Sequence, residues 1–316
     1  MAVITLTAAL SGCSAGPSSI EAAYDSIPQT CDKYTTGANA DKVSATGDFG
    51  TKPTITFAAP LSTTVLETKV LSEGNGPKFV GAEMIKFEYT AYNAATGKEF
   101  AASKYDGSDS ISQLFTTGQK LDFCHALSGV KAGSRVAILI PALMAHDGKG
   151  DSTNGISPTD NLLFVIDVQQ VYLPHAVGEK QAQVSGMPTV VLAANGQPGV
   201  QIPKAEAPAA YKQVTLIQGH GDVLKKGDSV TVHYTGAVWN SKVTFDSSWD
   251  KGEPAQFELK DDALIAGFLE ALVGQKIGSQ IIAVIPPDKG YGDQVQGEIP
   301  ANSTLVFVID ILGVSK

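Results

Sequence analysis

The amino-acid sequence predicts an α+β protein of two homologous domains, each a mostly antiparallel β-sheet with one short α-helix. Three observations lead to this prediction. The chain has 316 residues, a length that suggests about two domains. The order of residues in the first half recurs in the second half, which indicates an internal repeat. Apolar residues mostly alternate with a period of two, as in β-strands, and one stretch instead has the pattern of a short helix.

The internal repeat is visible as several matches at nearly constant spacing. Most matched residues lie 145 positions apart, and the last matched segment lies 143 positions from its copy. So many aligned matches with so small a slip indicate two copies of one domain. The matched segments are 72–76 with 217–221, 87–90 with 232–235, 97–100 with 242–245, and 161–167 with 304–310, and Phe123 falls opposite Phe268.

Composition divides the chain further. The stretch between the repeats is rich in Pro, Gly, Ala and Gln, and is predicted to be a linker. Within it, 188–192 resemble 53–57, so each domain is expected to have a short leading strand. The predicted organisation is an export signal over 1–12, a polar tether over 13–49, a first domain over 50–173, a linker over 174–204 and a second domain over 205–316.

The strands and the helix are clearest in the second domain. Val230, Val232 and Tyr234 share one face of a predicted strand. The segment from Ala263 to Val273 is the predicted helix, ended by Gly274 in the position of a C-terminal cap. Two further strands have same-face sets, which are Ile281, Ala283 and Ile285 in one and Leu305, Phe307, Ile309 and Ile311 in the other.

Charge and hydropathy exclude some classes of protein. The chain has 32 acidic and 23 basic residues and a net charge of −9. Binding to phosphates needs a basic surface, and no cluster of Lys and Arg is present, so a nucleic-acid partner is not expected. No apolar run approaches the roughly 18–20 residues of a membrane-spanning helix.

The N-terminal segment resembles an export signal of the lipoprotein type. Residues 2–10 are mostly apolar, and Leu10-Ser11-Gly12-Cys13 resembles the bacterial motif whose cysteine is lipidated and begins the mature chain. The basic residue that usually precedes the apolar run is missing. We expect an exported protein anchored to the outer face of the bacterial cell membrane through Cys13. The alternative is a short buried strand with an incidental thiol.

The other two cysteines, Cys31 and Cys124, form the single pair that export would expose to an oxidising compartment. A disulfide between them is therefore predicted. The alternative is two unpaired thiols buried in the core, where cysteine packs well.

The second domain combines several aromatic residues with one acid near Gly-rich turns. An apolar aromatic pocket with few polar groups is the usual form of a site for a small ligand. Each aromatic residue taken singly is more typical of a core than of a site. The aromatic residues are Tyr234, Phe245, Phe257, Phe268, Tyr291 and Phe307, and the acid is Asp246.

The order of motifs in this domain resembles the FKBP-type peptidyl-prolyl cis-trans isomerase family. Five motifs occur in the order and spacing of that family, and they cover about 213–314. The fold that this resemblance implies is a twisted antiparallel sheet wrapped over a short helix. The motifs occupy 232–236, 244–248, 264–268, 285–292 and 299–307.

The resemblance assigns roles to individual residues. Tyr234, Phe245, Ile265 and Phe307 would line a pocket for a proline ring, and Phe268 would form its floor. Asp246 would lie at its edge, near the carbonyl of the substrate. The Ile265 N–H and the Tyr291 hydroxyl would donate hydrogen bonds to carbonyls of the bound peptide. Ala255 stands where an additional Phe is common, so a wider pocket is expected there.

The resemblance also implies the partners. These are proline-containing unfolded or exported polypeptides, and the macrolide inhibitors of the family. No cofactor or metal is expected, because rotation about the X–Pro bond requires neither.

The first domain resembles a degenerate copy. Tyr89, Phe100, Phe123 and Phe164 occupy the aromatic positions of the pocket. Ala101 replaces the acid, His146 stands in the place of Tyr291, and Lys120 falls opposite Ile265. This domain is predicted to bind peptide weakly or only to support the second one.

Other chemistries have less support. The five histidines show no paired ligand spacing, and neither a nucleophile elbow nor a phosphate-binding loop is present. The loop after Asp147 fails the calcium-binding pattern, because Lys149 and Pro158 occupy ligand positions. The main alternative function is a non-catalytic, surface-tethered chaperone or peptide-binding module, and a remote one is a solute-binding lipoprotein.

Overall fold

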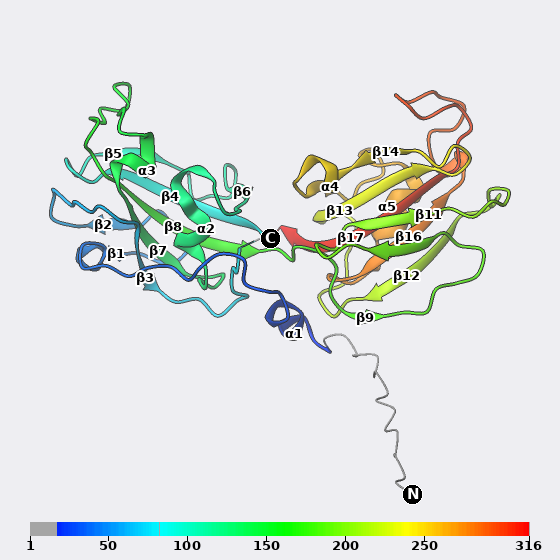
Figure 1. The fold of residues 1–316 in the computed structure, drawn as a ribbon, viewed down its shortest axis with the longest axis horizontal. Helices are drawn as coiled ribbons and strands as arrows, with labels where there is room; N and C mark the ends of the chain where they lie inside the picture. Colours follow the sequence, from blue (N-terminus) through cyan, green and yellow to red (C-terminus); the bar gives the residue numbers. More distant parts are fainter. Residues whose placement is uncertain (1–17, 82, 316) are drawn as a thin grey trace, which may run out of the picture.

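The structure, a computed structural model, describes residues 18–81 and 83–315 and contains two large antiparallel β-sheets lying side by side (Figure 1). The predicted α+β class is confirmed. The first sheet consists of β3 (Glu67–Ser72), β4 (Met84–Asn93), β5 (Glu99–Ala102), β6 (Ile111–Leu114), β7 (Arg135–Ile140) and β8 (Leu162–Val171). The second consists of β9 (Glu179–Lys180), β12 (Lys212–Gln218), β13 (Ser229–Val238), β14 (Thr244–Ser247), β15 (Ala255–Glu258), β16 (Gln280–Ile285) and β17 (Leu305–Ser315).

The two sheets have the same topology. The first has the strand order β3-β7-β8-β4-β5, with β6 also paired to β4. The second has β12-β16-β17-β13-β14, with β15 also paired to β13 and the short β9 added at the edge. This agreement strand by strand shows that the sequence repeat is a repeat of one fold.

The helices are short. The predicted helix is α5 (Ala266–Leu272), which begins later than expected because Ile265 has an extended backbone. Gly274 follows it with φ of 87°, a conformation that glycine adopts without steric cost. Within the described residues, no helix has the length and hydrophobicity that crossing a membrane requires. The remaining helices are α1 (Ile20–Asp25), α2 (Phe123–Leu127), α3 (Ala142–His146) and α4 (Ser248–Lys251), with 3₁₀ turns η1 (Ala40–Lys42), η2 (Lys120–Asp122) and η3 (Pro287–Lys289).

Both faces of the second sheet are buried. The predicted same-face sets of β13, β16 and β17 pack with α5 in one core. The alternate residues of β17, Val306 and Val308, pack on the opposite face against Met187 and Ile202. These two residues flank a hairpin of β10 (Thr189–Leu192) and β11 (Pro198–Gln201). The segment predicted to be a linker therefore covers the outer face of the second sheet.

The first sheet has an equivalent cover. Strands β1 (Ser44–Thr46) and β2 (Thr54–Thr56) form a hairpin. Ile55 of this hairpin packs with Leu139 and Leu163 on the outer face of the first sheet. The leading strands expected within 53–57 and 188–192 are β2 and β10.

Residues 18–49, predicted to be part of a polar tether, are ordered against the first domain. They include α1, η1 and β1, and bury Ala23, Cys31 and Val43. The prediction was wrong here because it weighed the overall polarity of the segment, whereas a few buried side chains decide whether a segment packs. The predicted export signal and Cys13 lie outside the described residues.

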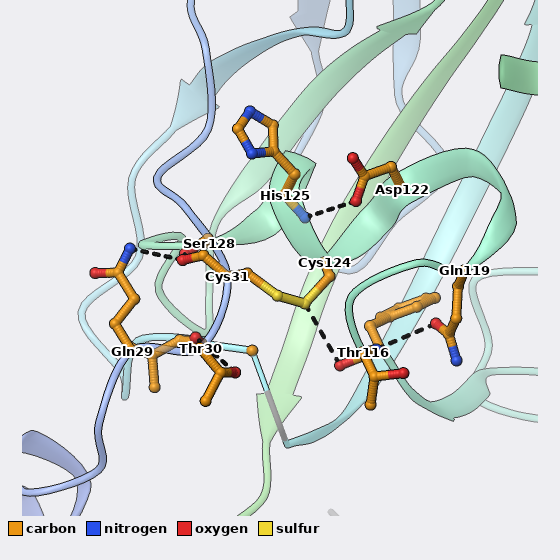
Figure 2. The surroundings of a disulfide bond; sticks show 12 residues. Gln29, Thr30, Cys31, Thr116, Gln119, Asp122, Cys124, His125 and Ser128 are labelled. Carbon is orange, nitrogen blue, oxygen red and sulfur yellow. Dashed lines mark hydrogen bonds between the residues drawn. A yellow bond between two sulfur atoms is a disulfide. The ribbon is translucent and has the colours of Figure 1, made fainter.

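A disulfide joins Cys31 to Cys124 of α2 (Figure 2). The Cys31 carbonyl also accepts hydrogen bonds from the Ser128 hydroxyl at 2.9 Å and from the Gln29 side-chain amide at 2.7 Å. The disulfide therefore ties the N-terminal segment to the helix that carries Phe123.

The two domains meet at a packed joint, where Figure 1 shows the end of β17 between the two sheets. The Leu173 N–H donates to the Leu312 carbonyl at 3.1 Å. The Tyr24 hydroxyl of α1 donates to the Val171 carbonyl at 2.9 Å. The buried side chains of the joint come from α1 and the residues just after it, β4, β17 and the segment after β8, and include Ala23, Ile27, Met84, Tyr172, Leu173, Val177 and Leu312.

A buried aspartate on the last strand of each sheet binds the segment that leads into that domain. Asp167 accepts a hydrogen bond from the Gly50 N–H, and Asp310 accepts one from the Ala176 N–H, both at 2.8 Å. Asp167 is also ion-paired with the buried Arg135 at 2.6 Å.

Asp310 has a neutral partner in place of an arginine. The Gln280 side-chain amide donates to it at 2.7 Å. Burial raises the pKa of Asp310 to about 6, even though the hydrogen bonds from Ala176 and Gln280 and the nearby His175 act to lower it. A hydrogen bond from an amide compensates less of the desolvation of a carboxylate than an ion pair does.

Asp310→Asn should therefore change how stability depends on pH. The folded-state pKa of about 6 lies above the ordinary 3.8, so the stability linked to this group is fully present below pH 3.8 and is lost as the pH rises through 6. The stability of the variant relative to wild type should be higher at pH 7 than at pH 4, by roughly 2–3 kcal/mol. Urea unfolding of both proteins between pH 4 and pH 7 measures this difference.

Asp167→Asn is the matched control, because it leaves Arg135 buried without its ion-pair partner and should destabilise the protein at pH 7. A stability difference for Asp310→Asn that does not vary with pH would contradict the prediction.

Candidate active site

A cavity of about 420 Å³ opens in the second domain, between the sheet, α5 and the segments on either side of them. This is within the usual size range of small-ligand sites. All seven pocket residues predicted from the sequence line it, and four more residues contribute to its wall. The predicted residues are Tyr234, Phe245, Asp246, Ile265, Phe268, Tyr291 and Phe307, and the others are Phe257, Asp262, Ala263 and Leu264.

Aromatic rings form the apolar wall. Phe268 reaches the sheet from α5, with its ring centre 5.0 Å from that of Phe307 on β17 and 5.4 Å from that of Phe257 on β15. Phe245 on β14 packs edge-on against Phe307 at 5.6 Å. A Cβ at Gly236 would lie 2.6 Å from the Phe245 ring and 2.8 Å from the Phe307 ring. Only glycine lets the two rings approach β13 this closely.

Asp246 supplies the charge at the edge of the cavity. Its carboxylate accepts a hydrogen bond from the Tyr234 hydroxyl and is paired with the Lys251 ammonium at 2.6 Å. Burial acts to raise the pKa of Asp246, but the bonds from Lys251 and Tyr234 outweigh it and lower the pKa below its ordinary value. The group is therefore ionised at neutral pH.

Helix α4 holds Lys251 in this position. The Ser248 hydroxyl accepts a hydrogen bond from the Tyr234 N–H at 2.8 Å, which fixes the start of α4 to β13. His233 contacts the same hydroxyl at 2.9 Å and stacks on Trp249, with ring centres 3.9 Å apart. Burial, with a smaller effect of His175, lowers the pKa of His233 to about 4, so this ring is neutral.

Two polar groups of the cavity wall are free to bind a ligand. Among the described residues, neither the Ile265 N–H nor the Tyr291 hydroxyl has a hydrogen-bond partner. Both were predicted from the sequence to bind carbonyls. The lining contains no serine, cysteine, lysine or histidine, so it offers no nucleophile of these types.

Part of the cavity wall was not predicted from the sequence. Phe257 was noted among the aromatic residues but received no role, although it touches the floor residue Phe268. Asp262, Ala263 and Leu264 lie in the turn just before α5, which the predicted helix had partly absorbed. Ala255, where a wider pocket was expected, packs against the core and is not part of the cavity wall.

The first domain has a similar group of rings. The ring centres of Tyr89 and Phe100 lie 6.3 Å and 6.4 Å from that of Phe164. In the second domain, the ring centres of Tyr234 and Phe245 lie 6.3 Å and 5.6 Å from that of Phe307. Phe123 lies 5.4 Å from Phe164. The predicted aromatic positions of the first domain are therefore gathered in one place.

A fifth ring, Phe115, was not predicted. It lies 5.3 Å from Phe123, as Phe257 lies 5.4 Å from Phe268. Phe257 belongs to a strand, whereas Phe115 follows the end of β6. The spacing of the sequence repeat therefore does not align Phe115 with Phe257. The two rings occupy similar places in their domains, but they are attached at different positions of the backbone. We call Tyr89, Phe100, Phe115, Phe123 and Phe164 the first-domain cage.

The polar groups of the first domain differ. Ala101 pairs with Ala91 in the register position where Asp246 pairs with Gly236. His146 is engaged within its own loop, because its ring contacts the Asp160 carbonyl at 2.8 Å and accepts from the Gly150 N–H at 3.0 Å.

Comparison with known proteins gives consistent matches. The sequence profile of FKBP-type peptidyl-prolyl cis-trans isomerases matches residues 221–312, a range that contains every residue of the cavity wall. A probable FK506-binding protein of Corynebacterium glutamicum is 37% identical over 116 residues, covering 37% of this chain and 97% of that protein. An FK506-binding protein of Streptomyces anulatus is 35% identical over 120 residues, covering 37% of this chain and 97% of that protein.

A longer relative is matched only in part. A probable FKBP-type peptidyl-prolyl cis-trans isomerase of Haemophilus influenzae is 48% identical over 98 residues, which cover 31% of this chain and 39% of that protein. The chain thus spans about two-fifths of this relative and nearly all of the two shorter ones.

Proposed function

The chain belongs to the FKBP-type peptidyl-prolyl cis-trans isomerase family, and from this premise we propose that the second-domain cavity isomerises X–Pro bonds of unfolded, exported polypeptides. The observation that carries the proposal is the convergence of an aromatic wall, an ionised carboxylate and two free hydrogen-bond donors in one cavity.

An apolar cavity suits the reaction. Rotation about an amide bond has a barrier of about 18–20 kcal/mol because the resonance of the amide must be broken. The twisted amide is less dipolar than the planar one, so a dry apolar wall disfavours the planar ground state more than the transition state. In this proposal the proline ring lies against Phe268 and Phe307, and the X–Pro amide lies toward the cavity edge.

The polar groups act on the twisted amide. When the nitrogen lone pair no longer donates into the carbonyl, the carbonyl carbon carries more positive charge. A carboxylate held near that carbon, here Asp246, therefore stabilises the transition state more than the ground state. The Ile265 N–H and the Tyr291 hydroxyl bind carbonyls of the peptide and keep the rest of the chain fixed while one side rotates.

The test is the isomerase activity of the full chain on an X–Pro tetrapeptide in a protease-coupled assay. We expect acceleration over the uncatalysed rate, and inhibition by a macrolide such as FK506, which two relatives bind according to their names. An inactive chain that still suppresses aggregation of an unfolded protein would replace this proposal with the non-catalytic chaperone function.

We further propose that the protein is exported and anchored by a lipid on Cys13. The support is the Leu10-Ser11-Gly12-Cys13 motif, together with a disulfide of the kind that oxidising compartments maintain. Mass spectrometry of the native protein should find an acylated Cys13 at the N-terminus. An unmodified thiol at Cys13 would refute the anchor.

A further inference from the structure

Three of the five rings of the first-domain cage are partly exposed to solvent, while Phe115 and Phe123 are buried. Tyr89 and Phe164 are partly exposed, whereas their counterparts Tyr234 and Phe307 are only 7% and 5% exposed. Phe100, at the edge, is partly exposed as well. Rings that served only as core would gain more stability from complete burial, so the exposed faces of this cage are available for a ligand.

The cage keeps the ring arrangement of the catalytic cavity but not its charge. Ala101 supplies no carboxylate at the position of Asp246. Among the described residues, the Tyr89 hydroxyl has no hydrogen-bond partner, while the Tyr234 hydroxyl donates to Asp246. The rings can therefore bind a proline ring by apolar contact, but no charged group at this position favours the twisted amide.

We infer that the first-domain cage is a second binding site for proline-containing segments of unfolded polypeptide, which it holds without isomerising them. The inference rests on the proposed function, because it takes the ligand class from the ring geometry that the two domains share.

The arrangement of the domains gives this site a role. The packed joint around Leu173 and Leu312 connects the two domains, so the cage and the catalytic cavity are held together in one folded protein. A long unfolded chain held at the cage presents its other prolines to the catalytic cavity at a raised effective concentration. A tetrapeptide is too short to use both sites. The cage should therefore lower the KM for protein substrates and leave the isomerisation of small peptides unchanged.

The experiment compares two substrates for the full chain. Phe100→Ala opens the cage at its partly exposed edge. For a carboxymethylated protein whose refolding is limited by an X–Pro bond, we expect KM to rise roughly three- to tenfold with kcat unchanged. For the tetrapeptide, kcat/KM should stay within about twofold of wild type.

Tyr92→Ala is the matched control. Tyr92 is a partly exposed ring on β4, the strand that carries Tyr89 and pairs with the strand of Phe100, but it packs with Phe57 on the opposite face of the sheet. Its removal should leave both substrates unaffected. A protein-substrate KM that rises equally in both variants would overturn the inference, because the effect would then follow from weakened folding of the domain.

Binding to the wild-type chain provides a test that does not depend on a variant. A fifteen-residue proline-containing peptide should shift the backbone NMR signals of Ala101 and Ala102, next to the cage. No shift there, while the tetrapeptide is still isomerised, would overturn the second site and leave the proposed function intact. No isomerisation of the tetrapeptide would instead overturn the proposed function.

Discussion

Phe268→Ala should lower the stability of the second domain by roughly 3–5 kcal/mol and abolish most of its activity. Phe268 is 4% exposed, and its ring contacts those of Tyr234, Phe257 and Phe307. Removing it leaves a void at the floor of the cavity and removes the surface on which the proline ring rests. Both tryptophans, Trp239 and Trp249, lie in the second domain, so tryptophan fluorescence during urea unfolding reports on this domain.

Phe123→Ala provides the corresponding change in the first domain, where the ring is 8% exposed. It should destabilise that domain while the tetrapeptide activity and the fluorescence transition stay close to wild type. If Phe268→Ala leaves stability and activity unchanged, Phe268 is not the floor of the working site.

Asp246→Ala should reduce kcat/KM for the tetrapeptide by roughly ten- to a hundredfold, which corresponds to about 1.4–2.7 kcal/mol of lost transition-state stabilisation. The charge lies next to apolar rings, where a substrate amide is poorly screened from it. The fold should survive, because the Asp246 side chain is 34% exposed and lies at the cavity edge.

Asp261→Ala removes the same charge from a neighbouring position. Asp261 is paired with Lys226 and does not line the cavity. Its removal should leave kcat/KM within about twofold of wild type. Equal losses in the two variants would show that net charge, and not the position of Asp246, affects the reaction.

The repeat and the alternation of apolar residues were sufficient to predict the sheets and one buried face of the second sheet. They could not reveal that the outer face of the second sheet is buried as well. Val306 and Val308 alternate along β17 with the residues of the inner face, and the sequence alone does not show that another segment packs on them. The cover is a hairpin within the predicted linker. A fragment that began at 205 would lack it and expose these side chains.

The pocket residues were predictable because the motifs fix both residue type and order. Lys251 was not, since nothing in the sequence distinguishes it from other surface lysines, and only the turn of α4 brings it to Asp246. Phe115 was missed because it reaches the cage from outside the aligned strand. Lys251 is placed by the short helix α4, and Phe115 is the residue that directly follows β6.

The most direct test of the central claim is the tetrapeptide kcat/KM of two matched full-chain variants, Phe245→Ala and Phe100→Ala. Each variant removes a partly exposed ring that packs edge-on against a phenylalanine of its own domain, Phe307 for Phe245 and Phe164 for Phe100. If the second-domain cavity is the isomerase site, Phe245→Ala loses at least about tenfold in kcat/KM while Phe100→Ala stays within about twofold of wild type. Equal losses in the two variants, or a larger loss in Phe100→Ala, would contradict that assignment.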